Sequence, residues 1–394
     1  MQRISAIYAK PGMELASPIY DNWGDLVLQK GTVLDARDIA QIDDIGVGEL
    51  FVDNKKTVDI QILPLVSPEL EGAISKALRR ALIECHTMLT SRNQQPVDLV
   101  LVNNLMDDLM ESLILGQTGD ASIAGCFSLR DYNYVHPVKV AGLSMLMGKA
   151  SGMNKREIKQ LGMAALFQNV GYVLLPQGIL EKPGFLSNAE MKAVERHPVY
   201  GSQILARYTG IGPEAANIVL QHHERWNGSG YPFGLKQDSI CVPARILGIT
   251  DVCFALASKR PHREEFLPAF AIEHSIVSSQ DAIEYIFAYS SELFDPEMVR
   301  VFARVVPVYP TGAMVKLNDG RIGIVSKSNP ECLKRPKIRI INGTAREIVE
   351  EVPDICTGCE LECDEKPGKK EGKKEIDLAK DNKKNVLISE INDY

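Results

Sequence analysis

The chain has 394 residues, enough for two or three domains, with 45% hydrophobic and 24% charged residues, as in ordinary globular proteins. Its formal net charge of -7 argues against binding to a nucleic-acid polymer or an anionic lipid surface, so a bound phosphate compound would need a local group of basic side chains. No apolar run reaches the roughly 18 residues of a membrane span, and no signal-peptide pattern follows Met1, so we expect a cytoplasmic protein.

The N-terminal part, residues 1–65, has the pattern of a small mixed α/β domain. Short strand-like runs at 26–28 and 49–52 lie beside turn sequences, and the segment between them has helical apolar spacing. Residues 66–120 form a helical connector of two amphipathic helices separated by an Asn-Gln-Gln-Pro break at 93–96. The second of these helices packs on the protein's own core or serves as the contact helix of a homodimer.

Residues 121–305 read as an all-helical domain, because no alternating strand pattern interrupts their helical spacing. The spacing predicts helices over 134–150, 156–168, 188–207, 213–223, 243–258 and 280–304. Residues 306–394 read as a small β-rich domain. Two alternating runs flank Asn318-Asp319-Gly320, which is a strong hairpin signal, and a charged stretch separates a third strand from a closing one.

The most specific motif is His222-His223-Glu224 followed by the loop Gly228-Ser229-Gly230-Tyr231-Pro232, with Asp251 further along the chain. Adjacent histidines, a glycine loop and a carboxylate are the residue types of a site for metal and phosphate. The segments 182–201, 219–235 and 244–263 resemble the HD-GYP family, bacterial phosphodiesterases that open cyclic di-GMP. The resemblance implies a mainly α fold, with an all-helical HD-type phosphohydrolase core between the small N-terminal α/β domain and the C-terminal β-rich domain.

The resemblance also implies a set of functional residues. Imidazole and carboxylate ligands suit iron, manganese or zinc. The basic residues Arg260 and Arg263 match positions that hold nucleotide phosphates in the family, and a guanidinium group suits a phosphate diester. The loop residues Gly228, Gly230 and Tyr231 are expected to complete the nucleotide site, together with Tyr172. The implied metal ligands are His136, His197, His222, His223 and Asp251.

The sequence departs from the family at its defining doublet. Gln168-Asn169 stands where the family has His-Asp, and Tyr172 stands where a lysine would face the phosphate. Tyr132 occupies the position at which some members add a glutamate for a third metal. Glutamine and asparagine remove an imidazole ligand and a bridging carboxylate, and a neutral amide oxygen cannot offset the charge of two cations. We therefore expect one divalent ion or none, and no intact catalytic set.

A second candidate site is formed by Cys356, Cys359 and Cys363. A Cys-x-x-Cys step is typical of zinc sites, but only three thiols lie close in sequence, so structural zinc and reduced free thiols both remain open. The cysteines at 85, 126, 241 and 253 are scattered singly in apolar surroundings, which predicts buried thiols rather than a disulfide framework.

Three functions follow from these patterns. The first is a degenerate HD-GYP protein of cyclic di-GMP signalling, a regulatory module that binds cyclic di-GMP or a related cyclic dinucleotide with little or no hydrolysis. The second is a metal-dependent cyclic di-GMP phosphodiesterase with an incomplete metal site. The third is a scaffold for partner proteins, which the sequence does not name, that binds no nucleotide.

Overall fold

The structure is a computed structural model whose described residues form three hydrophobic cores. The largest runs from Val66 to Val306, one lies within residues 4–52, and one lies within residues 313–338. In the part of the chain that the structure describes, no helix is long and apolar enough to cross a membrane. The described residues are 1–21, 25–53, 59–60, 62, 64–91, 96–115, 132–176, 178–180, 182, 185–258, 279–318, 320–329, 335–342, 375–377 and 388–392.

The N-terminal segment pairs its strands antiparallel around one helix, as its sequence pattern predicts. The helix begins with a capping box between Asp35 and Asp38 and ends at Gly46, whose φ of 78° is the left-handed conformation that glycine adopts readily. Strand β1 pairs with β4, and β2 pairs with β3. The elements are β1 (Gln2–Ser5), η1 (Ala6–Tyr8), β2 (Ile19–Tyr20), β3 (Leu26–Leu28), α1 (Ala36–Ile45) and β4 (Glu49–Val52).

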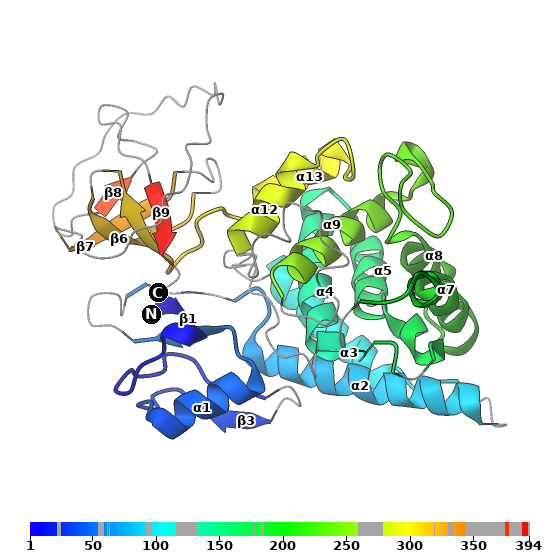
Figure 1. Ribbon diagram of the computed structural model, residues 1–394, viewed down its shortest axis with the longest axis horizontal. Helices are drawn as coiled ribbons and strands as arrows, with labels where there is room; N and C mark the ends of the chain where they lie inside the picture. The colour runs from blue at the N-terminus through cyan, green and yellow to red at the C-terminus, as the bar shows by residue number, and fades with distance from the viewer. Residues whose placement is uncertain are drawn as a thin grey trace.

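Two long helices, α2 (Pro68–Thr90) and α3 (Val100–Leu115), join this segment to the helical body (Figure 1). Their apolar faces are buried in the same core as the helices that follow, with Leu78 and Met106 fully covered. The alternative that α3 packs on the protein's own core therefore agrees with the structure.

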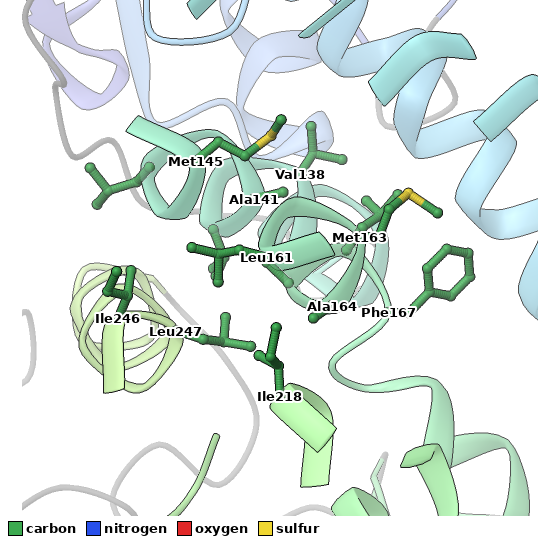
Figure 2. Packing of buried hydrophobic residues seen from close by; sticks show 14 of the residues in the cluster. Val138, Ala141, Met145, Leu161, Met163, Ala164, Phe167, Ile218, Ile246 and Leu247 are labelled. Atoms are coloured by element: carbon green, nitrogen blue, oxygen red, sulfur yellow. The ribbon is translucent and has the colours of Figure 1, made fainter. Parts of the chain in front are cut away.

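The helical body carries the site. Its centre is formed by four helices whose buried side chains interdigitate, among them Val138, Leu161, Ile218 and Leu247 (Figure 2). The mainly α fold expected from the sequence is confirmed. The elements are α4 (Tyr132–Ala150), α5 (Lys155–Leu166), η2 (Val170–Leu174), α6 (Asn188–Val194), α7 (His197–Tyr208), α8 (Pro213–Gln221), η3 (Gln237–Ser239), α9 (Val242–Leu256), α12 (Ser279–Ala288) and α13 (Pro296–Val305).

Two predicted helices are each broken into two. The range 188–207 ends one helix at Val194 and begins another at His197, so the single-helix prediction was wrong. The range 280–304 is interrupted between Ala288 and Pro296, where Asp295 caps α13 by accepting from the Glu297 amide. In both ranges a proline stands at the first or second position of the new helix, where its missing N–H costs nothing.

The C-terminal segment is a five-stranded antiparallel sheet in the order β8-β7-β6-β5-β9. The predicted hairpin is confirmed, since Met314 pairs with Ile324 and Lys316 with Ile322. Arg339 in this sheet forms a bidentate ion pair with Asp59, which links the sheet to the N-terminal half of the chain. The strands are β5 (Met314–Leu317), β6 (Ile322–Lys327), β7 (Lys337–Asn342), β8 (Glu375–Asp377) and β9 (Ile388–Asn392).

Truncating Phe302 should strongly destabilise the helical body. Its ring is fully buried in α13 and meets Phe287 edge to face at 6.1 Å between centroids. We expect Phe302→Ala to lower the free energy of unfolding by about 3–5 kcal/mol, because it removes apolar contacts and leaves a cavity. The measurement is denaturant unfolding followed by helical circular dichroism.

The matched control is Phe185→Ala, which removes the same atoms from a side chain that is 66% exposed. A surface change of this kind should stay within about 0.5 kcal/mol. Equal losses from the two variants would contradict the core described for α13.

Candidate functional site

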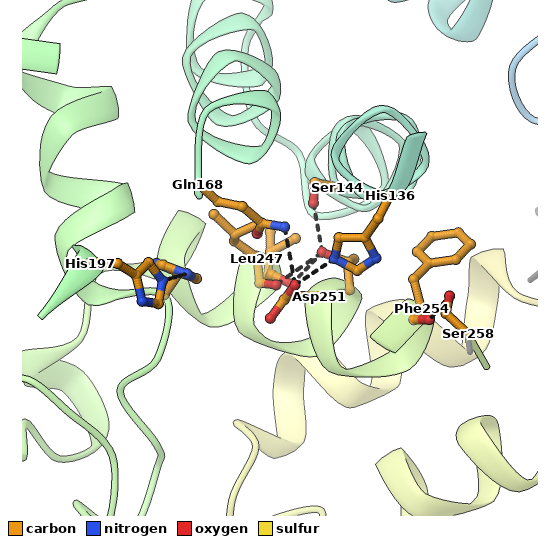
Figure 3. Close-up of polar contacts among 11 residues, drawn as sticks. His136, Ser144, Gln168, His197, Leu247, Asp251, Phe254 and Ser258 are labelled. Atoms are coloured by element: carbon orange, nitrogen blue, oxygen red, sulfur yellow. Dashed lines mark hydrogen bonds and ion pairs between the residues drawn. The ribbon is translucent and has the colours of Figure 1, made fainter. Parts of the chain in front are cut away.

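The first half of the site is centred on the carboxylate of Asp251 in α9. Its Oδ1 lies 2.8 Å from Nε2 of His136, which comes from α4, and 3.1 Å from Nε2 of Gln168, which follows the end of α5 (Figure 3). His136 and Gln168 are fully buried, and the Asp251 side chain is only 13% exposed. Because a carboxylate only accepts, both nitrogens donate to it.

A buried pair of hydroxyl groups fixes α4 against α9 beside this carboxylate. Oγ of Ser144 lies 2.7 Å from Oγ1 of Thr250, and Thr250 also contacts the carbonyls of Ile246 and Leu247 within its own helix. Thr250 directly precedes Asp251, so this contact helps to set the separation between the two helices that carry His136 and Asp251.

The second half is a cluster of three imidazoles. His197 begins α7, His222 follows the end of α8, and His223 is the next residue. One ligand atom from each ring lies within 4.8 Å of the others, a spacing that could hold a metal ion. Nδ1 of His197 donates to the Val194 carbonyl at 2.8 Å, and Nδ1 of His222 donates to the Val219 carbonyl at 2.6 Å.

The electrostatics keep His197 and His222 neutral. Burial, followed by the neighbouring His222, lowers the pKa of His197 to about 3. Burial also lowers the pKa of His222, while the charge of Asp251 acts in the opposite direction on both rings. The neutral imidazole is the form that binds metals, so the environment favours the ligand state.

Two tyrosines cover the imidazoles. The ring of Tyr172, from η2, lies 4.6 Å from that of His197 between centroids, and the ring of Tyr231 stacks on His223 at 4.6 Å. Burial raises the pKa of Tyr231 well above its ordinary value, so its hydroxyl stays protonated. Where the resemblance leads one to expect a lysine, an aromatic ring therefore lies against His197.

Glu224 holds the chain directly after the glycine loop. Its carboxylate accepts the backbone N–H of Phe233 at 2.8 Å and that of Leu235 at 2.9 Å, and the residue is 5% exposed. A side chain on Gly230 would collide with the backbone of His223 and Arg225, so the loop passes this close only with glycine.

Sequence reasoning did not assign a role to Glu224 or to its neighbour Arg225. The half-buried Arg225 donates from one guanidinium nitrogen to the carbonyls of His222 and Glu224, which braces the end of α8. The available signal was the pair of charged residues directly after the two histidines. Charged side chains in a largely apolar segment need hydrogen-bond partners, which here are backbone groups.

The five expected ligands do not form one uniform set. His197, His222 and His223 come together, whereas His136 pairs with Asp251 across a different hydrogen bond. Asn169 is half-buried, and its carbonyl accepts the Tyr172 amide at 2.9 Å. Several predictions fall outside the described residues: those on the side chain of Tyr132 and on Arg260, Arg263, Cys126, Cys356, Cys359 and Cys363. Of the cysteines predicted to be buried, Cys85 and Cys253 are buried and Cys241 is half-buried.

A divalent ion on the three imidazoles would supply a positive charge to an oxygen of a bound phosphate group. The cluster suits such an ion because it offers neutral nitrogen donors in a buried place. The Asp251 half offers a carboxylate whose contacted oxygen already accepts two N–H groups.

Comparisons with known proteins bear on the family of the chain. Residues 104–298 match the HD domain family. The chain is 27% identical over 364 residues to a cyclic di-GMP phosphodiesterase of Pseudomonas aeruginosa, covering 86% of this chain and 85% of that protein.

Two further relatives align with shorter segments. A cyclic di-GMP phosphodiesterase response regulator of Xanthomonas campestris is 34% identical over 42% of this chain and 41% of its own length. A 3'3'-cGAMP-specific phosphodiesterase of Vibrio cholerae is 34% identical over 34% of this chain and 30% of its own length. The chain thus spans less than half of either protein. It belongs to the HD-GYP family of HD domain proteins.

Removing the Glu224 carboxylate should free the glycine loop. Glu224→Ala leaves the Phe233 and Leu235 amides without their acceptor, a loss of about 1–3 kcal/mol that corresponds to about five- to 150-fold faster amide exchange. Hydrogen–deuterium exchange of the 228–235 segment measures this change. Glu292→Ala, at an exposed glutamate, is the control and should leave the segment unchanged. Equal protection in both variants would show that Glu224 does not hold the loop.

Proposed function

We propose that this chain is a degenerate HD-GYP protein of cyclic di-GMP signalling that binds a cyclic dinucleotide and hydrolyses it very slowly or not at all. The names of the relatives support the ligand class, since they act on cyclic di-GMP or 3'3'-cGAMP. The observation that carries the proposal is the hydrogen bond from Nε2 of Gln168 to Oδ1 of Asp251, which puts a neutral amide at the centre of the pocket.

The chemical reason is the charge that hydrolysis needs. In a two-metal site the ions stabilise the attacking and leaving oxygens together, and a carboxylate between them offsets their repulsion. Gln168 and Asn169 offer only neutral amides at the corresponding places. Two cations held about 4 Å apart without that carboxylate repel each other strongly, so the pocket favours fewer ions and loses transition-state stabilisation.

The nucleotide would be held by cations and by the glycine loop. Arg260 and Arg263 are assigned to the phosphates from the resemblance, and a guanidinium fork matches a phosphate diester. Gly228, Gly230 and Tyr231 belong to the loop beside His223. Tyr172 offers an aromatic ring where the family has a lysine. Affinity for phosphate is therefore expected to depend mainly on the two arginines.

The second candidate is a metal-dependent cyclic di-GMP phosphodiesterase with an incomplete metal site. The compact group of His197, His222 and His223 favours it, because one ion on three imidazoles could polarise a phosphate oxygen. A scaffold that binds no nucleotide is the remaining alternative, and it is separated from the others by a binding measurement.

The purified protein should hydrolyse cyclic di-GMP at least about a thousandfold more slowly than an intact HD-GYP enzyme assayed in parallel. Losing one well-placed metal charge removes several kcal/mol of transition-state stabilisation, which has this magnitude. The assay uses micromolar protein with added manganese or iron and separates the products by chromatography. Turnover close to that of the intact enzyme would establish the phosphodiesterase alternative instead.

Cyclic di-GMP should bind without cleavage, and Arg260→Ala or Arg263→Ala should each weaken the affinity by about tenfold or more, because a charge-assisted contact to phosphate contributes about 1.5–3 kcal/mol. Isothermal titration calorimetry measures the change. Arg207→Ala is the charge-matched control, since Arg207 is exposed ten residues beyond His197 on α7, about 15 Å along the helix. Absence of any binding at millimolar nucleotide would leave the scaffold. Binding indifferent to both arginine changes would place the nucleotide elsewhere.

A further inference from the structure

The two halves of the site differ in what they offer a cation: the imidazole half offers nitrogen lone pairs, and the Asp251 half has N–H groups. In the imidazole cluster, the N–H groups of His197 and His222 are both used on backbone carbonyls, at 2.8 and 2.6 Å. A neutral imidazole has one N–H, so the Nε2 atom of each ring carries a lone pair. These two Nε2 atoms face each other at 3.4 Å. Two buried lone pairs that point at one another leave a place that a cation satisfies, and an outer N–H donated to a carbonyl is the usual support of a metal-binding histidine.

The separation of the two nitrogens can be compared with the ligand spacing of tetrahedral and octahedral ions. A tetrahedral ion with metal–nitrogen bonds of about 2.0–2.1 Å separates neighbouring ligand nitrogens by about 3.3 Å. An octahedral ion with bonds of about 2.1 Å would bring adjacent ligands to about 3.0 Å. The observed 3.4 Å agrees with the tetrahedral value. His223 is the half-buried third ring, and its ligand atom lies within 4.8 Å of the other two.

The Asp251 half presents hydrogens instead of lone pairs. Because Oδ1 of Asp251 only accepts, Nε2 of His136 must carry its proton at 2.8 Å, and the Gln168 amide turns its NH2 group toward the same oxygen at 3.1 Å. Oε1 of Gln168 is buried without a hydrogen-bond partner within the described part of the chain. Turning the amide to use that oxygen would set two acceptors against each other, so the NH2 group stays on the carboxylate.

We infer that this chain holds a single tetrahedral divalent cation of the zinc or cobalt class on His197, His222 and His223, and that the Gln168 amide takes the place of a second ion beside Asp251. To ligate a metal, His136 would have to release the Nε2 proton that it donates to Asp251, and Gln168 could offer only a neutral amide oxygen. A second ion beside Asp251 is therefore disfavoured relative to one on the three imidazoles. The inference rests on the proposed function, in which this site holds fewer metal ions than that of an intact enzyme.

The test counts metal ions and needs no nucleotide, so its failure is distinguishable from failure of the proposed function. The full chain is stripped with a chelator, reloaded with Zn²⁺ or Co²⁺, desalted, and measured by mass spectrometry of the metal. We expect one ion per native chain and the intense visible absorption of tetrahedral Co²⁺. Two ions per chain, none, or the weak absorption of octahedral Co²⁺ would overturn the inference. This measurement uses the native protein and does not depend on the folding of a variant.

Variants locate the ion. His223→Ala removes the half-buried ligand and should lower zinc affinity at least about tenfold, whereas His136→Gln should keep one ion. His86→Ala, at an exposed histidine of α2, is the matched control and should also keep one. The double change Gln168→His with Asn169→Asp should raise the count toward two. Loss of the ion in His136→Gln but not in His223→Ala would place it beside Asp251, and no gain in the double variant would overturn the role given to Gln168. Far-UV circular dichroism verifies that each variant is folded.

Discussion

The arrangement of the site depends on the carboxylate of Asp251 and on what neutralises it. This group lies in α9 among buried side chains, and a buried carboxylate is tolerated only when its charge is satisfied. His136 and Gln168 satisfy it with two N–H groups that come from α4 and from the end of α5. The same contact therefore ties three helices together and decides the protonation of His136. These two hydrogen bonds stabilise the negative charge of Asp251 without a cation.

The imidazole cluster differs from the Asp251 half because its N–H groups point outward and its lone pairs point inward. Its outer N–H groups are fixed on the carbonyls of Val194 and Val219, each three residues earlier on the same stretch of chain, so the lone pairs can only point inward. Burial keeps His197 and His222 neutral, and Arg225 braces the backbone from which His222 and His223 project. The site is therefore electrostatically asymmetric, with N–H groups bound to Asp251 on one side and imidazole lone pairs on the other.

Much of this could be read from the sequence, because the relevant signals are local. Helical spacing predicted α4, α5, α8 and α9, and Asn318-Asp319-Gly320 predicted the turn between β5 and β6. The break between α6 and α7 was missed, since both halves keep the same apolar spacing across residues 195–196. The grouping of the five ligand-type residues was not accessible either. It depends on how helices far apart in the chain cross, and on side-chain contacts such as that of Gln168 with Asp251, which no spacing encodes.

The backbone path around the site does not depend on which side chains occupy positions 168 and 169. A Cβ atom at Gly171 would collide with the carbonyl of His197 and lie 2.8 Å from the amide nitrogen of Gly201, so the turn after Gln168-Asn169 is packed directly on α7. That packing positions both Tyr172 and His197. It involves backbone atoms only, and therefore does not depend on whether positions 168 and 169 carry an imidazole and a carboxylate or two amides. Glutamine and asparagine are close in size to the side chains they replace, so the helix end keeps its path while the pocket loses charge. In the proposed function, the site therefore keeps its backbone shape while positions 168 and 169 carry neutral amides.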